Sequence, residues 1–359
     1  LAGVLRQAIQ GLEPVSEDVL FGSIDDKGTQ SALQINDIPL DNTNIVVRDG
    51  IRIDDVRGVT EDGAKYDFEV IESGGRLRID CVIRQCHENQ VDKIERALVA
   101  LANLLKNGIS IGARTMNGLG RVTCKDISLE YYDFTKPEHV KAWLLRKAGT
   151  SVAIPERCMI SEKDLVIDME CCLEDTLLIK SIFEEAWEDK SVALFIPGTS
   201  IKGVLRHHCS RILQALGRSN QAVDTLFGYS IEKTNESRKG RVMVDEVYFD
   251  KSFTQEEQPR IRMDRFTGGA MNGALFQDHP VRKGKGKQLA FPLRITVKDC
   301  SDSEAGLVLL LVKDLMTGQI TLRANRTIGY GRIKGNAVTV QYHGESYGID
   351  GTGKVTEGE

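Results

Sequence analysis

Several signals that would assign this chain to a familiar class are missing from its 359 residues. No apolar run is long enough to span a bilayer, so we expect no membrane partner. No signal peptide is visible, and none of the eight cysteines stands in a Cys-x-x-Cys pair, which argues against a zinc site. Most cysteines fall in apolar or strand-like stretches, so we expect reduced core thiols and a cytoplasmic location.

The chain also lacks an excess of positive charge. Its formal net charge is −5, which argues against a large basic surface. No P-loop, dinucleotide fingerprint or Ser/His/Asp arrangement is present, so those enzyme classes are not indicated. The basic residues that do cluster are Arg282, Lys283, Lys285 and Lys287 in one glycine-containing loop, and Lys202, Arg206, His207, His208 and Arg211 at one predicted helix start.

What is present is a duplication. Ile-Lys-Gly-Val-Leu-Arg at 201–206 answers Leu-Ala-Gly-Val-Leu-Arg at 1–6, and Leu-Phe-Gly occurs at both 226–228 and 20–22. Ile-Arg-Met-Asp at 261–264 answers Ile-Arg-Ile-Asp at 51–54. Gly-Tyr-Gly-Arg-Ile at 329–333 answers Gly-Leu-Gly-Arg-Val at 118–122. Four matches in the same order predict two copies of one module.

The second copy has a strand-like segment and a loop, about 164–200, before its Lys-Gly-Val-Leu-Arg motif. The first copy starts inside the corresponding motif. We therefore expect Leu1 to be the first residue of an incomplete chain, whose first strand and loop are missing.

Copy two predicts the order strand, helix, strand, strand, helix, strand. Strands are expected at 164–172, 242–249, 288–297, 319–324 and 332–342. A helix is expected from about 201 to 217, capped by Thr199 or Ser200, and an amphipathic helix at 303–316 that ends at Gly318. A projecting hairpin is expected at 260–276. This order is that of a ferredoxin-like or RRM-like fold.

Copy one repeats the pattern, with helices at 1–12 and 91–106, strands at 32–38, 76–83, 109–113 and 120–130, and a hairpin at 46–70. The predicted fold class is α+β, with two tandem RRM-like (ferredoxin-like) domains that each carry an inserted β-hairpin thumb. We expect these domains at 1–135 and 158–345. A linker at 136–157 joins them, with a short helix around Trp143, and a Gly-rich tail at 346–359 is expected to be frayed.

Three features carry chemistry. The Gly-rich loops at 112–121 and 325–332 end in arginines, and glycines let backbone amides approach a phosphate. The segment 196–206 places amides, two hydroxyls and two cations at a helix start, which favours an anion. The hairpin at 260–270 interleaves arginines with apolar residues, as in a wedge that contacts a nucleic-acid backbone and unstacks bases. The alternatives are a simple hairpin connection, a capped helix and an amphipathic ribbon.

These motifs, in this order, resemble the RAMP superfamily, and most of all the backbone subunits of type III CRISPR effector complexes. The tandem form is similar to type III-D-like systems. The resemblance implies an RRM-like palm and a hairpin thumb, stacking along a guide CRISPR RNA, and pairing with a complementary target RNA. It also implies partnership with other RAMP and small subunits.

The resemblance further implies a catalytic acid in the loop before 196–206. Asp189, in Asp-Lys-Ser-Val at 189–192, stands in that place, although Ser191 replaces the usual proline. Asp189 is therefore the predicted catalytic residue and ligand of Mg²⁺ or another divalent cation. Other acids of the loop could substitute, namely Asp175, Glu184, Glu185 and Glu188. A merely solvated acidic loop is the alternative.

The predicted function is an RNA-binding backbone subunit that cleaves target RNA as a metal-dependent endoribonuclease. A non-catalytic structural subunit is the second hypothesis, and a guide-processing ribonuclease of the same superfamily is the third. We expect RNA contacts mainly to phosphate and 2′-hydroxyl groups. The predicted RNA-binding residues are Arg6, Arg52, Arg57, Arg114, Arg121, Thr199, Ser200, Lys202, Arg206, His207, Arg262, Arg265, Arg326 and Arg332.

Overall fold

The computed structural model describes residues 1–10, 17–23, 28–41, 43–53, 60–75, 81–83, 90–155, 163–174, 176–178, 195–231, 236–249, 253–255, 257–283, 290–322, 329–351 and 354–357. The chain divides into two compact units. Unit 1 comprises Leu1–Thr43, Gly74–Thr115 and Gly120–Ser161. Unit 2 comprises Asn44–Ser73, Met116–Leu119 and Glu162–Glu359.

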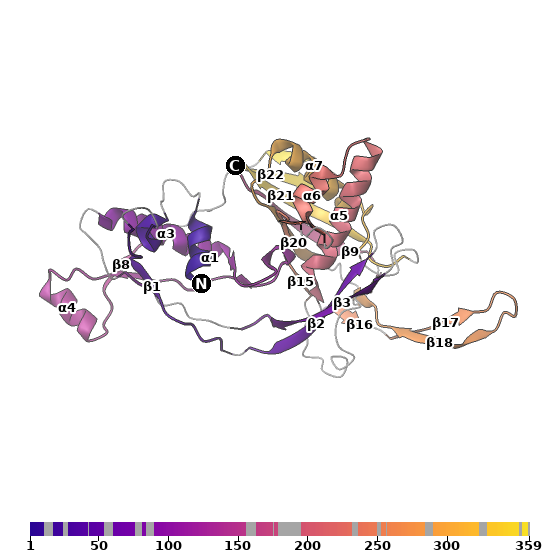
Figure 1. The fold of residues 1–359 in the computed structure, drawn as a ribbon, viewed down its shortest axis with the longest axis horizontal. Helices are drawn as coiled ribbons and strands as arrows, with labels where there is room; N and C mark the ends of the chain where they lie inside the picture. Colours follow the sequence, from indigo (N-terminus) through magenta and orange to yellow (C-terminus); the bar gives the residue numbers. More distant parts are fainter. Residues whose placement is uncertain are drawn as a thin grey trace. The chain divides into compact units, whose positions relative to one another are not determined.

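Unit 2 is built on a six-stranded antiparallel sheet of order β14-β20-β9-β21-β22-β23 (Figure 1). Its first four strands in chain order, β9, β14, β20 and β21, have the sheet order of a ferredoxin-like fold. The strands span Leu165–Leu173 (β9), Val242–Val244 (β14), Ala290–Val297 (β20), Ile333–Tyr342 (β21), Glu345–Asp350 (β22) and Val355–Glu357 (β23). The predicted order of strands and helices is therefore confirmed for this unit.

Helices complete the core of unit 2. They span Gly198–Ala215 (α5), Gln221–Phe227 (α6) and Asp302–Met316 (α7). Helix α5 packs on β14, α7 packs on β21, and α5 contacts α7. Apolar residues that recur at helical spacing, such as Ile201, Leu205 and Cys209 on α5, are buried against the sheet. Helix α7 begins with a capping box formed by Ser301 and Glu304.

Two long hairpins belong to unit 2. The first pairs β2 (Ile45–Ile53) with β3 (Thr60–Ile71), and the second pairs β17 (Gln258–Met263) with β18 (Ala270–Asp278). In the chain, β17–β18 lies between β14 and β20, the second and third of the four ferredoxin-like strands, as predicted. The other strands form small sheets: β10 (Thr176–Leu177), β19 (Val281–Lys283) and β16 (Phe253–Gln255); β11 (Phe195–Ile196) and β15 (Val247–Tyr248); β12 (Gly228–Ile231) and β13 (Glu236–Lys239).

Unit 1 has a smaller core, formed by residues such as Leu5, Ile9, Leu20, Ile94 and Leu101. Its helices are Ala2–Ile9 (α1), Asp18–Phe21 (α2), Val91–Asn107 (α3) and Pro137–Leu144 (α4). Its described strands form pairs: Leu33–Ile35 (β1) with Cys81–Ile83 (β4), Ile109–Ser110 (β5) with Arg121–Val122 (β6), and Leu129–Tyr131 (β7) with Thr150–Val152 (β8). A 3-10 helix spans Thr115–Asn117.

Some predictions were wrong in detail. The segment after Gly344 is not frayed where it is described, because β22 and β23 extend the sheet. The expected strand at 319–324 is reduced to a single bridge between Thr321 and Arg332 in the described residues. The expected strand at 242–249 is divided into β14 and β15, which pair with different partners.

The start of α5 also differs from the prediction. Pro197 is its N-cap residue and makes no side-chain capping bond, so neither Thr199 nor Ser200 caps the helix. A proline with its fixed φ suits the start of a helix, where no partner for an N–H is needed. None of the described helices is long and apolar enough to cross a membrane.

Candidate nucleic-acid interface

The Gly-rich turn of unit 2 is closed by backbone contacts. Leu322 N–H donates to the Gly331 carbonyl oxygen over 2.8 Å, and Gly331 N–H donates to the Thr176 carbonyl oxygen over 2.8 Å. Gly331 has φ +81°, and a Cβ there would lie 1.9 Å from the Leu322 oxygen. Only glycine fits this turn. The Gly331 amide is therefore used within the fold, contrary to the expectation that it faces a phosphate.

The same turn closes in unit 1. Ile111 N–H donates to the Gly120 carbonyl oxygen over 2.8 Å, and a Cβ on Gly120 would lie 1.9 Å from the Ile111 oxygen. The two Gly-x-Gly-Arg motifs thus share one backbone arrangement, in which a glycine at positive φ accepts a hydrogen bond from an earlier backbone N–H.

The arginines that follow these turns fold back onto the protein. Arg121 donates from Nη2 to the Asn107 carbonyl oxygen over 2.9 Å at the end of α3. Arg332 lies 3.5 Å from the Glu174 carboxylate, although its side chain is 62% exposed. Lys334 also pairs with Glu174. Arg332 is partly neutralised but still accessible, and Arg121 supports a helix end.

The motif arginines at the helix starts are also occupied. Arg206 on α5 lies 3.3 Å from Asp224 and donates to the Gly228 carbonyl oxygen, so it ties α5 to the end of α6. In unit 1, Arg6 on α1 lies 3.0 Å from Asp18 on α2. In both units, the arginine of the repeated Gly-Val-Leu-Arg sequence therefore links one helix to the helix that follows it.

Lys202 lies in a more enclosed position than expected. Its Nζ donates to the Met116 carbonyl oxygen over 3.3 Å. Burial, reinforced by the neighbouring cations Arg206 and Lys239, lowers the pKa of Lys202 to about 8. A Cβ on Gly198 would lie 2.3 Å from the Val244 oxygen and 2.6 Å from the Asn117 oxygen. The α5 start thus packs against protein segments of the same unit.

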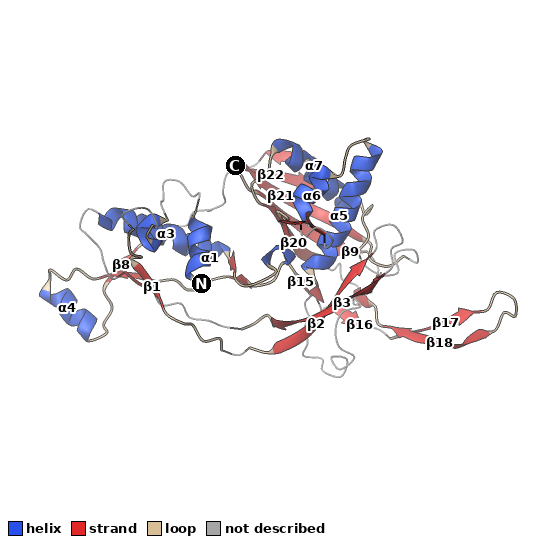
Figure 2. Ribbon diagram, viewed as in Figure 1, coloured by secondary structure: helices blue, strands red, loops and turns tan. Residues whose placement is uncertain are grey.

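Hairpin β17–β18, whose two strands run side by side in Figure 2, carries exposed cations and apolar side chains. Arg262 and Arg265 are exposed, and Phe266 at the tip is 100% exposed. Asp264 accepts hydrogen bonds from Phe266 N–H at 2.7 Å and Thr267 N–H at 3.0 Å, which fixes the tip. These amide contacts lower the pKa of Asp264. Other exposed apolar side chains on this hairpin are Ile261, Met263, Met271, Leu275 and Phe276.

The base of this hairpin is anchored on the Gly-rich turn. Arg260 donates to the Tyr330 hydroxyl, lies 5.0 Å from the Tyr330 ring centroid and pairs with buried Asp278 at 3.1 Å. The Tyr330 hydroxyl donates to Gln258 over 2.6 Å. The hairpin and the Gly-Tyr-Gly-Arg turn, which the sequence treats as separate motifs, therefore form one assembly.

Hairpin β2–β3 is anchored by a buried charge. Arg48 lies 2.6 Å from Glu246, with side chains 9% and 7% exposed, and its guanidinium carbon lies 4.2 Å from the Phe195 ring centroid. Tyr248 donates to Glu246 over 2.8 Å and stacks on Phe195 at 5.5 Å. Burial, followed by the nearby Glu246, raises the pKa of Tyr248 to about 12. We call these four residues the Arg48 cluster.

Sequence reasoning missed the Arg48 cluster. Arg48 and Glu246 are 198 positions apart, and no local motif links them. The available signal was weak: a lone arginine within an otherwise aliphatic strand segment, Ile-Val-Val-Arg at 45–48. Buried arginines need an anionic partner, so the position called for one.

The remaining predicted site residues fall into three groups. Arg52, Arg114 and Thr199 are exposed, whereas Ser200 and His207 are half-buried. Arg57, Arg326 and Asp189 lie outside the described residues, as do the other candidate acids of the Asp189 loop, Asp175, Glu184, Glu185 and Glu188. Within the described ranges, no group of three or more His, Cys, Asp or Glu side chains could hold a metal ion.

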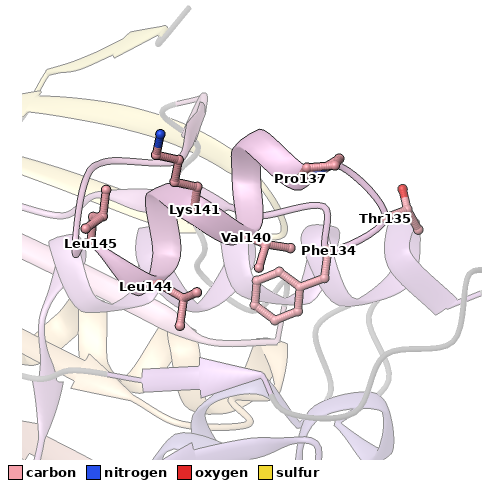
Figure 3. Close-up of a pocket in the computed structure, with 7 residues that line it drawn as sticks. All are labelled: Phe134, Thr135, Pro137, Val140, Lys141, Leu144 and Leu145. Atoms are coloured by element: carbon pink, nitrogen blue, oxygen red, sulfur yellow. The ribbon is translucent and has the colours of Figure 1, made fainter.

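Unit 1 also has an open apolar pocket along α4, of about 420 Å³ (Figure 3). Phe134, Val140, Leu144 and Leu145 line it, and Lys141 is its charged member. A small-molecule active site usually places several convergent polar groups in such a pocket. This lining has none of that character, so the pocket does not compete with the hairpin as a functional site.

The model of the RAMP superfamily matches residues 1–123 and 181–334, well over half of the chain. No curated protein matches. A solved structure, described as the cryo-EM structure of the type III-B Cmr-beta bound to cognate target RNA, is similar with a TM-score of 0.36 and 17% identity. That similarity covers 51% of this chain and 62% of the other.

Proposed function

Because the chain belongs to the RAMP superfamily, we propose that it binds RNA as a backbone subunit of a type III CRISPR effector complex. The partners of such a subunit are a guide CRISPR RNA, a complementary target RNA, and other RAMP and small subunits. The family match supports the RAMP assignment, and the sequence motifs support the choice of complex.

Hairpin β17–β18 is the observation that carries this proposal. It exposes Arg262 and Arg265 beside Phe266, and Arg260 and Tyr330 hold its base. Arginine forks bind phosphates, and an apolar tip can stack on or separate bases. A nucleic acid offers both the phosphates and the bases at once, whereas a small ligand does not.

The tandem organisation is part of the proposal. Hairpins β2–β3 and β17–β18 have the same strand register: Ile51 pairs with Lys65 as Ile261 pairs with Leu275. Each hairpin has an irregularity at the residue that follows this isoleucine. Together with the matched helix joins and glycine turns, this favours two copies of one RAMP module.

We further propose that Asp189 acts with Mg²⁺ or another divalent cation in cleaving target RNA. The support is its place in the acidic loop before α5, at the position that the family resemblance gives to a catalytic acid. A bound cation would supply charge stabilisation at the scissile phosphate. A structural subunit without catalysis is the alternative.

One assay separates these possibilities. The assembled complex, with guide RNA and labelled complementary target RNA, is compared with Mg²⁺ and with EDTA, using intact protein and Asp189→Ala. Loss of one band from the cleavage pattern, with unchanged target binding, supports catalysis at Asp189. An unchanged pattern assigns the cuts elsewhere. Failure to retain guide RNA would reject the RNA-binding proposal itself.

A further inference from the structure

Hairpin β2–β3 has two faces of different character. Residues that pair across antiparallel strands share a face. One face carries Arg48 opposite Phe68, and Arg48 is buried in the Arg48 cluster. The opposite face, which we call the outer face, carries the pairs Ile45–Ile71, Val47–Glu69, Asp49–Asp67 and Ile51–Lys65. All eight of these residues are exposed.

The outer face is markedly apolar for an exposed surface. Ile45 is 67% exposed, Ile51 53%, Ile71 51% and Val47 44%. Single exposed aliphatic residues are ordinary, but Ile45, Ile71 and Val47 are neighbours on this ribbon, and Ile51 lies beyond the Asp49–Asp67 pair. Patches of exposed apolar residues mark contact surfaces.

The same face is acidic. It carries three carboxylates, from Asp49, Asp67 and Glu69, against one cation. Lys65 lies 2.9 Å from Asp49 and also interacts with Asp67, so one lysine faces three carboxylates and the face keeps an excess of negative charge. Asp49 also stands directly opposite Asp67. Like charges opposed across a ladder destabilise it, and a cationic partner would relieve that repulsion.

These acids are not required by the hairpin itself. The register of β17–β18 places Pro259, Gln277 and His279 at the positions that correspond to Asp49, Asp67 and Glu69. The second hairpin forms in the same register without them. The charge of the outer face therefore needs an explanation outside the hairpin fold.

We infer that the outer face of β2–β3 is a docking surface for a protein partner that presents lysine or arginine side chains beside apolar ones. Carboxylates repel a phosphate backbone, so RNA is disfavoured on this face. The acids lie in the middle of the face with aliphatic side chains on both sides of them, which matches a mixed apolar and basic protein surface. The inference rests on the proposed function only because the partner is sought among the subunits of the assembled complex.

The Arg48 cluster strengthens this inference. It fixes the opposite face of the ribbon, so the outer face is presented by a held element. A pre-ordered surface loses less conformational entropy on binding. Docking at this face then needs no rearrangement of the hairpin.

Site-specific photocrosslinking in the assembled complex tests the inference. A photoreactive residue replaces Val47 on the outer face, and a matched one replaces Leu275 on β17–β18. We expect position 47 to yield a protein adduct that survives ribonuclease, with the linked peptide carrying lysine or arginine. We expect position 275 to yield an RNA adduct.

Charge variants make the test quantitative. Asp67→Lys/Glu69→Lys should lower the position 47 adduct at least tenfold, and Asp67→Asn/Glu69→Gln should lower it by less. Glu95→Lys/Glu236→Lys, which changes two exposed acids on α3 and β13 by the same charge, should leave it unchanged. Circular dichroism of each variant checks that it folds.

The opposing outcomes are distinct. An RNA adduct at position 47, an adduct with a second copy of this chain, or the absence of a protein adduct there overturns the inference. So does a yield that charge reversal leaves intact. Failure of the proposed function appears elsewhere, as no RNA adduct at position 275 while the protein adduct at position 47 persists.

Discussion

Hairpins β2–β3 and β17–β18 pair in the same register, yet different chemistry anchors them. Arg48 holds the first by an ion pair with Glu246 that is almost fully buried. At the corresponding position the second has Gln258, which accepts a hydrogen bond from Tyr330. A strand register is set by alternation and turn geometry, so it survives while the anchoring side chains change.

The surfaces that the two hairpins present also differ. The first carries Asp67 and Glu69 where the second carries Gln277 and His279. Both carry an exposed arginine at the matched position, Arg52 and Arg262, and the second adds exposed Arg265. Two hairpins with the same strand register can therefore present different side chains to different partners. The lesson is that repeated topology does not imply repeated function.

The largest expected effect comes from breaking the first anchor. Arg48→Ala leaves the 7%-exposed Glu246 without its cation, and removing one member of a buried pair costs about 3–5 kcal/mol. We expect the amides of β2–β3 to exchange with deuterium at least about a hundredfold faster. Gln258→Ala is the matched control and should leave β2–β3 exchange unchanged.

A double substitution at Arg48 and Glu246 tests whether the loss of charge pairing causes the faster exchange. Arg48→Met/Glu246→Leu replaces both charges with apolar groups, a change that is often close to neutral for a buried pair. Slow exchange of β2–β3 should return in this double variant. Rapid exchange in both variants would show that packing by the guanidinium, rather than charge pairing, holds the hairpin.

The second effect concerns RNA. Arg262→Gln/Arg265→Gln should weaken binding of single-stranded RNA about tenfold or more, and should reduce the slope of log K against log salt by about 1.4. Arg52→Gln on the first hairpin should change affinity less than about twofold, since acids surround it. Fluorescence anisotropy at several salt concentrations measures both. Equal losses from the two hairpins would contradict the division of roles.

A smaller effect is expected at the second anchor. Tyr330→Phe removes the hydroxyl that accepts from Arg260 and donates to Gln258, at a cost of about 1 kcal/mol. Amide exchange of β17–β18 should rise several-fold, with β2–β3 unaffected. A response in both hairpins would mean that the anchors are not independent.

The smallest expected effect is a difference in how salt changes the lowered pKa values of two carboxyl groups, Asp49 and Asp264. The hydrogen bond from Lys65 lowers the pKa of Asp49 below its ordinary 3.8, whereas backbone amides lower that of Asp264. In both cases the stabilisation is present above pH 3.8 and is lost as pH falls through the lower folded-state value. In NMR titrations, 1 M salt should raise the pKa of Asp49 and shift Asp264 less, because salt screens exposed ion pairs.

Local structure was largely readable from the sequence. Apolar spacing predicts α3 at 91–106, which is observed as Val91–Asn107, and alternation predicts β9 at 164–172, observed as Leu165–Leu173. The repeated motifs predict the element order and both hairpins. These features depend on residues that are close in the sequence, so the spacing of apolar residues and the turn-forming residues predict them.

The tertiary structure decided which charged groups are available. Sequence predicts that Lys202 and Arg206 contact RNA, and in the fold they donate to the Met116 and Gly228 carbonyl oxygens. The Gly331 amide donates to the Thr176 carbonyl oxygen. The fold joins Arg48 to Glu246 across 198 positions. A local sequence pattern shows the periodicity of a helix or strand. It does not show which distant residues contact that helix or strand. Burial and pairing of charge are therefore settled only when the chain is folded.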